Sequence, residues 1–112
     1  MAETLQNKYI ASNGTTAVKV LDGEGSDIVY TILSITICNT RSGDDETFDL
    51  YVKDVDNSAD YYIYMTQSLP ALATFEHTSK LIIKDDEELT FVLDDNTNGT
   101  DVDIIISYLK QT

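Results

Sequence analysis

The feature that most constrains the fold of this chain is an alternation of apolar and polar residues with a period of two. In residues 47–53, Phe48, Leu50 and Val52 alternate with residues of more polar character. Successive side chains of a β-strand point to opposite faces of its sheet, so this pattern predicts a half-buried strand. The same alternation predicts inward-facing residues in three further runs: Phe75 and His77; Leu89, Phe91 and Leu93; and Val102, Ile104, Ile106 and Tyr108.

The longest apolar run, residues 28–38, changes its phase in the middle. Tyr30 and Ile32 share one face, whereas Ile35 and Ile37 have the opposite parity. A shift of one residue moves every later side chain to the other face of a sheet. We therefore expect either a β-bulge near Ile32 or a strand that passes from one packed sheet to another.

Turn-forming residues separate these runs, and no segment has strong helix formers at helical spacing. Segments rich in Asp, Asn, Gly and Ser occupy residues 21–27, 40–46, 53–59 and 94–100. About seven or eight short strands with turns every 8–12 residues predict an all-β, antiparallel β-sandwich of the jelly-roll type. Residues 1–16 are polar and weakly patterned, so we expect an extended N-terminal arm, followed by one β-sandwich domain over residues 17–112.

The charge of the chain excludes several kinds of partner. Twenty acidic residues face seven basic ones, which gives a formal net charge of −13. Nucleic acids and anionic membrane surfaces recruit Lys and Arg clusters, so we expect neither partner. The first residues have neither the basic start nor the apolar segment of a secretory signal, and we expect synthesis in the cytoplasm.

Candidate chemical groups are few, and we expect no enzymatic activity, no cofactor and no metal site. The single cysteine, Cys38, lies in a β-branched run and reads as a small buried side chain, while the single histidine is His77. The segment from Asp94 to Gly99 matches the first half of a calcium-binding EF-hand loop, but Ile105 stands where a bidentate glutamate is required. We interpret residues 94–101 as a polar hairpin loop and leave cation binding open. The acidic clusters at residues 44–46 and 85–88 fit solvated turns.

A tyrosine-rich run at residues 58–65 is the main candidate for an interaction surface. Strict alternation would direct Tyr61, Ile63 and Met65 into the core and leave Tyr62 and Tyr64 on the other face. Tyr51 is then a possible cross-strand neighbour of this exposed pair. We predict that six residues contact a partner. Three are the tyrosines of this surface and three lie in the N-terminal arm: Tyr51, Tyr62, Tyr64, Leu5, Tyr9 and Ile10.

Several segments together resemble a group of small virion proteins of tailed bacteriophages. The run IVYTILSITICNT (residues 28–40) resembles their first core strand, which ends here in Ile37, Cys38 and Asn39. Residues 47–52 match a Thr-Phe-x-Leu-x-Val strand, residues 60–65 a tyrosine-containing strand, and residues 81–92 a hairpin. Residues 102–109 fit the closing strand, so the resemblance covers residues 17–110. The hairpin tip departs from the group, because residues 85–88 replace the usual Gly-Asp.

The resemblance implies a non-enzymatic β-sandwich that decorates a virion. In this interpretation the chain is a capsid decoration, or cement, protein on the capsid exterior, and it bridges major capsid subunits together with sister copies as a homotrimer. A tail fibre or baseplate accessory module is one alternative. A carbohydrate-binding β-sandwich module is another, with Tyr51, Tyr62 and Tyr64 as stacking residues, although the lack of tryptophan weakens it.

Overall fold

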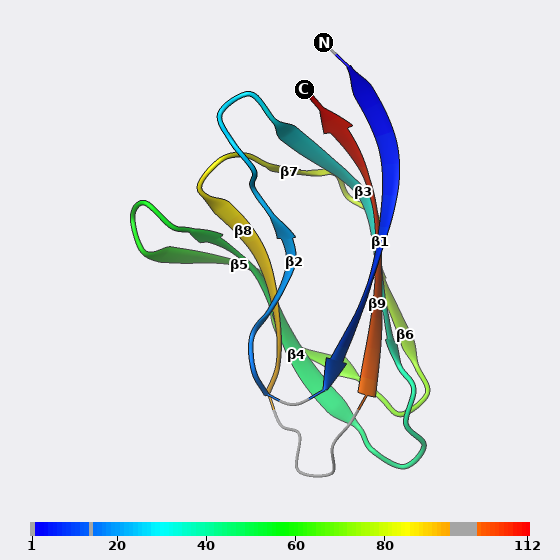
Figure 1. Cartoon of the computed structure of the whole chain (residues 1–112). Coiled ribbons are helices and arrows are strands. Elements are labelled where there is room, and N and C mark those ends of the chain that lie inside the picture. The colour runs from blue at the N-terminus through cyan, green and yellow to red at the C-terminus, as the bar shows by residue number, and fades with distance from the viewer. Residues whose placement is uncertain (1, 14, 95–100) are drawn as a thin grey trace.

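The computed structural model describes residues 2–13, 15–94 and 101–112, and within these ranges it contains nine β-strands and no helix (Figure 1). No helix in the part described could therefore span a membrane. The strands are β1 (Glu3–Asn13), β2 (Val18–Asp22), β3 (Val29–Asn39), β4 (Glu46–Asp54), β5 (Ala59–Leu69), β6 (Thr74–His77), β7 (Leu81–Ile83), β8 (Glu87–Leu93) and β9 (Asp101–Gln111).

The strands form two antiparallel sheets that pack face to face (Figure 1). Sheet A has the order β1-β9-β3-β6, with the short strand β7 also paired to β3, and sheet B has the order β2-β8-β4-β5. Strands adjacent in sequence thus often lie in different sheets, which is the arrangement of a jelly roll. The predicted fold class, an all-β antiparallel sandwich, is confirmed.

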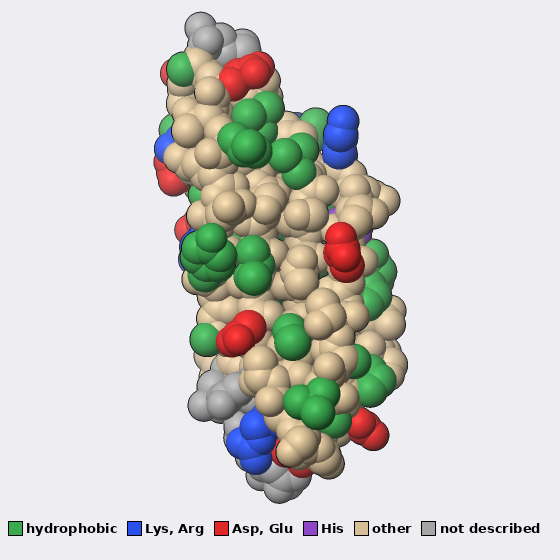
Figure 2. All heavy atoms as spheres, turned by 90° about the vertical axis from the view of Figure 1, so that its right-hand side faces the viewer, with side chains coloured by type: hydrophobic (Ala, Val, Ile, Leu, Met, Phe, Trp, Pro, Cys, Tyr) green, Lys and Arg blue, Asp and Glu red, His purple; other side chains and the backbone are tan. Residues whose placement is uncertain are grey.

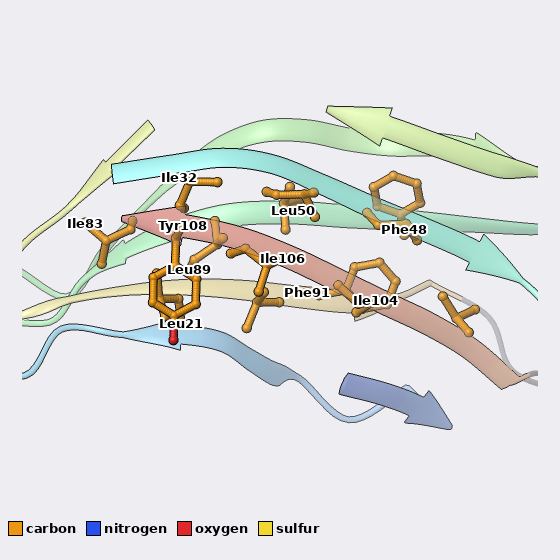
Figure 3. Close-up of a cluster of buried hydrophobic side chains, with 14 of the residues drawn as sticks. Leu21, Ile32, Phe48, Leu50, Ile83, Leu89, Phe91, Ile104, Ile106 and Tyr108 are labelled. Atoms are coloured by element: carbon orange, nitrogen blue, oxygen red, sulfur yellow. The ribbon is translucent and has the colours of Figure 1, made fainter. Parts of the chain in front are cut away.

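The core lies between the two sheets and is built by the alternation seen in the sequence (Figure 3). Phe48 and Phe91 from sheet B are fully buried, and their rings stack at 5.3 Å between centroids. Burying a large apolar side chain contributes roughly 1.5–3 kcal/mol, so this face fixes the register of each central strand. The inward residues predicted for β8 and β9 are all buried: Leu89, Phe91, Leu93, Val102, Ile104, Ile106 and Tyr108.

The phase change in β3 is a β-bulge. Ile32 pairs with Tyr108 of β9, and the next paired residue, Ser34, lies opposite Ser107. Leu33 is the extra residue, and the strand remains in sheet A. The bulge lets both Ile32 and Ile35 be fully buried, which confirms the first of the two expectations for this run.

Residues expected to form an extended arm outside the sandwich instead form a strand of it. β1 is extended, but it pairs with β9 along its whole length, from Glu3 opposite Gln111 to Asn13 opposite Asp101. Its inward positions include Gln6, which is half-buried, and Lys8, which is exposed. Because this edge of the sandwich is only partly covered, polar residues are tolerated there and the sequence lacks the usual alternation.

The loop between β3 and β4 is held by a buried amide. Asn39 has no exposed surface, and its Nδ2 donates to the carbonyl oxygens of Asp44 at 2.8 Å and Leu69 at 3.2 Å. Its Oδ1 accepts from the backbone N–H of Arg41 at 3.1 Å. The asparagine of the Ile37-Cys38-Asn39 motif therefore has a structural role, because its amide bonds this loop to the end of β5.

Candidate interaction surface

The tyrosine-rich strand β5 does not follow strict alternation, because its pairing with β4 is interrupted twice. Leu50 pairs with Tyr64 and Tyr51 with Tyr62, so Ile63 is an extra residue. A second irregularity separates the Phe48 and Leu50 pairs. Each extra residue reverses the side-chain parity of the strand that follows, so Tyr64 shares the inner face of Leu50 while Tyr62 keeps the outer face of Tyr51.

The predicted positions of three residues in this run were wrong. Tyr61 and Met65 were expected in the core but are 63% and 64% exposed. Tyr64 was expected beside Tyr62 on the outer face but is half-buried against the core. Its ring contacts Phe75 at 4.8 Å between centroids, and its hydroxyl lies 2.7 Å from Nδ1 of His77.

Tyr51 and Tyr62 do form the expected cross-strand pair on the outer face of sheet B. Their ring centroids lie 5.0 Å apart, with planes tilted by 39°. Tyr62 is 45% exposed and Tyr51 is half-buried. Burial raises the pKa of the Tyr51 phenol, with a further contribution from the nearby carboxylate of Asp60. This pair is a small aromatic platform surrounded by charge.

The remaining candidates, Leu5, Tyr9 and Ile10, lie in β1 on opposite faces of sheet A. Leu5 and Tyr9 are 69% and 73% exposed on its outer face, whereas Ile10 points inward and packs against the core. Tyr9 lies opposite Ile105 of β9, which is 42% exposed, and Leu5 lies opposite Leu109. Tyr9 and Ile105 also border an open hollow of about 370 Å³.

We name this outer side of β1, β9, β3, β6 and β7 the sheet A face, and its middle is free of charged residues. Register places three carboxylates on this face: Glu3 and Asp103 border the uncharged middle at its two ends, and Glu76 of β6 lies beside Thr36. Figure 2 shows hydrophobic side chains spread over this side of the molecule with few charged ones between them. The described residues in the middle of the sheet A face are Leu5, Asn7, Tyr9, Thr31, Ser34, Thr36, Ile105, Ser107 and Leu109.

Sequence reasoning missed the contribution of β9 and β7 to the sheet A face. Ile105 follows the buried Ile104 and precedes the buried Ile106, so it occupies a position where alternation expects a polar residue. Ile82, 58% exposed, does the same in β7. An apolar residue at an outward position of a strand is the signal that could have revealed this surface.

His77 and Cys38 do not form a catalytic pair. His77 is 6% exposed and points inward, and its Nε2 has no hydrogen-bond partner among the described residues. Cys38 pairs with Thr74 and Asp103, which places its side chain on the outer face of the same sheet. The sheet therefore separates the thiol from the imidazole. No group of three potential metal ligands occurs within the described ranges, and residues 95–100 of the possible cation loop lie outside them.

A second hollow, of about 340 Å³, is lined by Glu24, whose carboxylate is hydrogen-bonded within the protein. Glu24 lies on its wall and accepts from Nζ of Lys110 at 3.1 Å. Hydrogen bonds from Tyr30 and then Lys110 lower the pKa of Glu24, and burial raises the pKa of Tyr30. These contacts join the loop after β2 to the end of β9, which is a structural role.

Comparisons with known proteins define the fold and leave the function open. No family model matches the chain, and no curated protein matches it. A protein from Bacillus endospore appendages, described as forming disulfide-linked pili, is similar with a TM-score of 0.55 and 8% identity over 98% of this chain and 88% of that one.

Two further solved structures are less similar. A protein of infectious bursal disease virus, Gx strain, has a TM-score of 0.49 and 6% identity, covering 99% of this chain and 32% of that one. The CBM22-1-GH10 modules of Clostridium thermocellum xylanase 10B, complexed with xylohexaose, have a TM-score of 0.44 and 19% identity, covering 91% of this chain and 19% of that one. The likeness to the endospore appendage protein, at a TM-score of 0.55, supports the fold alone.

Proposed function

We propose that the protein is a non-enzymatic structural protein of a tailed-bacteriophage virion, and specifically a capsid decoration protein. In this role the sheet A face binds the outer surface of the major capsid protein, and each copy bridges neighbouring capsid subunits. Leu5 and Tyr9 are the predicted contact residues that lie on this face. The resemblance of residues 17–110 to small phage virion proteins supports the assignment to a virion.

The observation that carries the proposal is the uncharged middle of the sheet A face on a chain with a net charge of −13. A random surface of such a chain would carry many carboxylates. Cores of protein interfaces are depleted of charge, as the middle of this face is, and Leu5, Tyr9 and Ile105 supply exposed large side chains to it. The acidic surface elsewhere would keep decorated particles apart.

Binding of the purified protein to phage capsids that lack it would test the proposal. We expect Tyr9→Asp and Ile105→Asp to abolish co-sedimentation with the capsids, because each places a charge in the middle of the sheet A face. Tyr61→Asp, at a 63% exposed tyrosine in β5 of the other sheet, is the matched control and should bind as the unmodified protein does. Equal binding by all three variants would refute the role of the sheet A face.

Copy number separates capsid decoration from a tail fibre or baseplate accessory role. A decoration protein is present at hundreds of copies per particle, because it binds every equivalent position of the capsid lattice. A tail component is present at a few copies. Quantitative mass spectrometry of purified particles gives this number. The homotrimer implied by the resemblance is tested by sedimentation of the free protein.

A second candidate function is carbohydrate binding at the outer face of sheet B. The observation that favours it is the Tyr51–Tyr62 pair, because exposed aromatic rings can stack on sugar rings. A glycan array would test it. Signal that is lost in Tyr62→Ala and retained in Tyr9→Ala would support sugar binding, and no signal above background would remove this candidate.

A further inference from the structure

The sandwich has several exposed strand edges, and most of them are protected against pairing with another chain. β2 has only five residues, and its register shifts between Lys19 and Leu21. β5 is interrupted twice along its pairing with β4. The edge beyond β3 consists of β6 and β7, which have four and three residues and are separated along the chain. Short strands and bulges are the usual devices that prevent edge-to-edge association.

The edge at β1 is neither short nor interrupted, and Lys8 is the charged residue at its inward positions. Its eleven residues pair with β9 without a register shift, and they include neither proline nor glycine. Ala2 and Thr112 exchange both backbone hydrogen bonds, at 3.2 and 2.9 Å. Hydrogen-bonded and free positions alternate along an antiparallel strand, so the N–H and C=O groups of the odd-numbered residues point away from β9. These residues are Glu3, Leu5, Asn7, Tyr9, Ala11 and Asn13.

The charge of this edge also permits approach by an identical molecule. β1 and β9 together contain three acidic and two basic residues, for a formal net charge of −1, although the whole chain carries −13. The like-charge repulsion expected between two copies is therefore weakest here. Leu5 and Tyr9 are the most exposed large apolar side chains of β1, and both belong to the odd-numbered set.

We propose that β1 pairs antiparallel with β1 of a second copy, with Asn7 opposite Asn7 on a two-fold axis. Residues on the same face must lie opposite one another, so only registers that pair odd with odd residues are possible. The register centred on Asn7 places Leu5 opposite Tyr9 of the second copy and Lys8 opposite Gln6. A register centred on Lys8 would instead place two ammonium groups in opposition, which is unfavourable.

This pairing makes sheet A continuous through both molecules and joins their two sheet A faces into one surface. The contact is isologous, because each copy contributes the same strand. It goes beyond the proposed binding to capsids and can be tested without them. A two-fold contact does not close a trimer, so the mass of the free protein distinguishes it from the homotrimer implied by the resemblance.

Sedimentation velocity of the purified protein tests the contact. We expect a concentration-dependent species of twice the mass of the chain, and we expect Asn7→Pro to raise its dissociation constant by about tenfold or more. Proline at this position removes an N–H that points to the free edge, so pairing with β9 should persist and circular dichroism should be unchanged. The matched control is Asn7→Ala, which also loses the 2.7 Å hydrogen bond from Ser107 but keeps the N–H.

The outcomes separate the possible occupants of the edge. Dimers in Asn7→Ala but not in Asn7→Pro would support the proposal. A monomeric wild-type protein, or a trimer unaffected by Asn7→Pro, would overturn it. A wild-type monomer whose capsid binding is lost in Asn7→Pro would also overturn it, and would assign the edge to a strand of the capsid.

Cross-linking tests the register. The Cβ atoms of a hydrogen-bonded antiparallel pair lie about 5.5 Å apart, which is more than the roughly 3.5–4.5 Å of a disulfide but suits a short bifunctional thiol reagent. In a Cys38→Ser background, such a reagent should therefore give covalent dimers of Asn7→Cys. Leu5→Cys should not cross-link, because each Leu5 lies opposite Tyr9 of the second copy. Dimers through Leu5→Cys and not through Asn7→Cys would overturn the register centred on Asn7.

Discussion

β1 and β5 are strands of equal length at edges of the two sheets, and their difference is instructive. Each has eleven residues. β1 is regular, and its outward residues Leu5 and Tyr9 are among the most exposed apolar side chains of the molecule. β5 is interrupted twice, and its Tyr64 turns toward the core.

The comparison shows that backbone irregularity decides what an edge strand can do. In β5, Thr66 has a φ of 51°, and its N–H donates to Oδ1 of Asp49 at 2.7 Å instead of to a strand backbone. A second chain would meet no continuous row of free backbone groups there. In β1 the row is unbroken, so the same length of chain offers a template for pairing.

Truncating the inward tyrosine of β5 should have the largest effect. Tyr64→Ala removes ring contacts with Phe48 and Phe75 and the hydrogen bond to His77, and we expect it to lower the free energy of unfolding by about 2–4 kcal/mol. Tyr9→Ala in β1 should change it by no more than about 0.5 kcal/mol, because the ring is exposed. Urea denaturation measures both free energies of unfolding. Similar losses in the two variants would contradict the inference that Tyr64 supports the core and Tyr9 does not.

Removing only the hydroxyl of Tyr64 should cost less. Tyr64→Phe leaves Nδ1 of His77 without its 2.7 Å partner, and we expect a loss of about 1–2 kcal/mol. Tyr62→Phe in the same strand removes a hydroxyl from an exposed ring and should have little effect. Chemical denaturation of both variants tests this, and equal stability of the two would show that the Tyr64–His77 hydrogen bond does not stabilise the fold.

Glycine substitutions should have opposite signs in the two strands. Thr66→Gly relieves a left-handed conformation that costs an ordinary residue roughly 1–2 kcal/mol, so we expect a net gain of about 0.5 kcal/mol after the entropy lost by glycine. Thr4→Gly in regular β1 should destabilise by about 0.5–1 kcal/mol. Thr66→Ala keeps the Cβ atom and should give no gain. Melting temperatures of the three variants provide the measurement.

The smallest effect is expected from the acidic pair beside the irregular part of β5. Burial, and then the carboxylate of Asp49, raise the pKa of Asp94, although the hydrogen bond from Thr47 opposes this. A raised pKa means that the charged carboxylate weakens the fold at neutral pH and that protonation restores stability as the pH falls through the folded pKa toward 3.8. After solvent screening, we expect Asp94→Asn to gain about 0.2–0.5 kcal/mol at pH 7. The gain should disappear near pH 3, and an equal gain at both pH values would contradict this explanation.

The sequence predicted those parts of the fold in which burial enforces parity. β8 and β9 are covered by the core along their length, so Phe91 and Ile106 could be assigned to the inner face from alternation alone. The bulge in β3 was predictable because the apolar residues on either side of it, Ile32 and Ile35, are out of phase.

The candidate surface was predicted only in part, for two physical reasons. In β5 both the odd-numbered and the even-numbered positions hold large amphipathic residues. The bulges around Tyr64 therefore cannot be recognised from the alternation of apolar and polar residues. β1 pairs with a strand that is about a hundred residues later in the chain, and no local pattern reports such a contact. Leu5 and Tyr9 could be named as contact residues from the sequence. That they lie on the same face as Ile105 follows only from the pairing of β1 with β9.

The position of β9 between β1 and β3 has a consequence for how the chain acquires its structure. β9 follows every strand with which it pairs, so the nascent polypeptide on the ribosome holds β1 and β3 long before the strand that joins them is synthesised. Folding dominated by such distant pairings is slow, commonly milliseconds to seconds. β1 can therefore join sheet A only after translation of residues 101–111, whereas β3 can pair with β6 and β7 earlier.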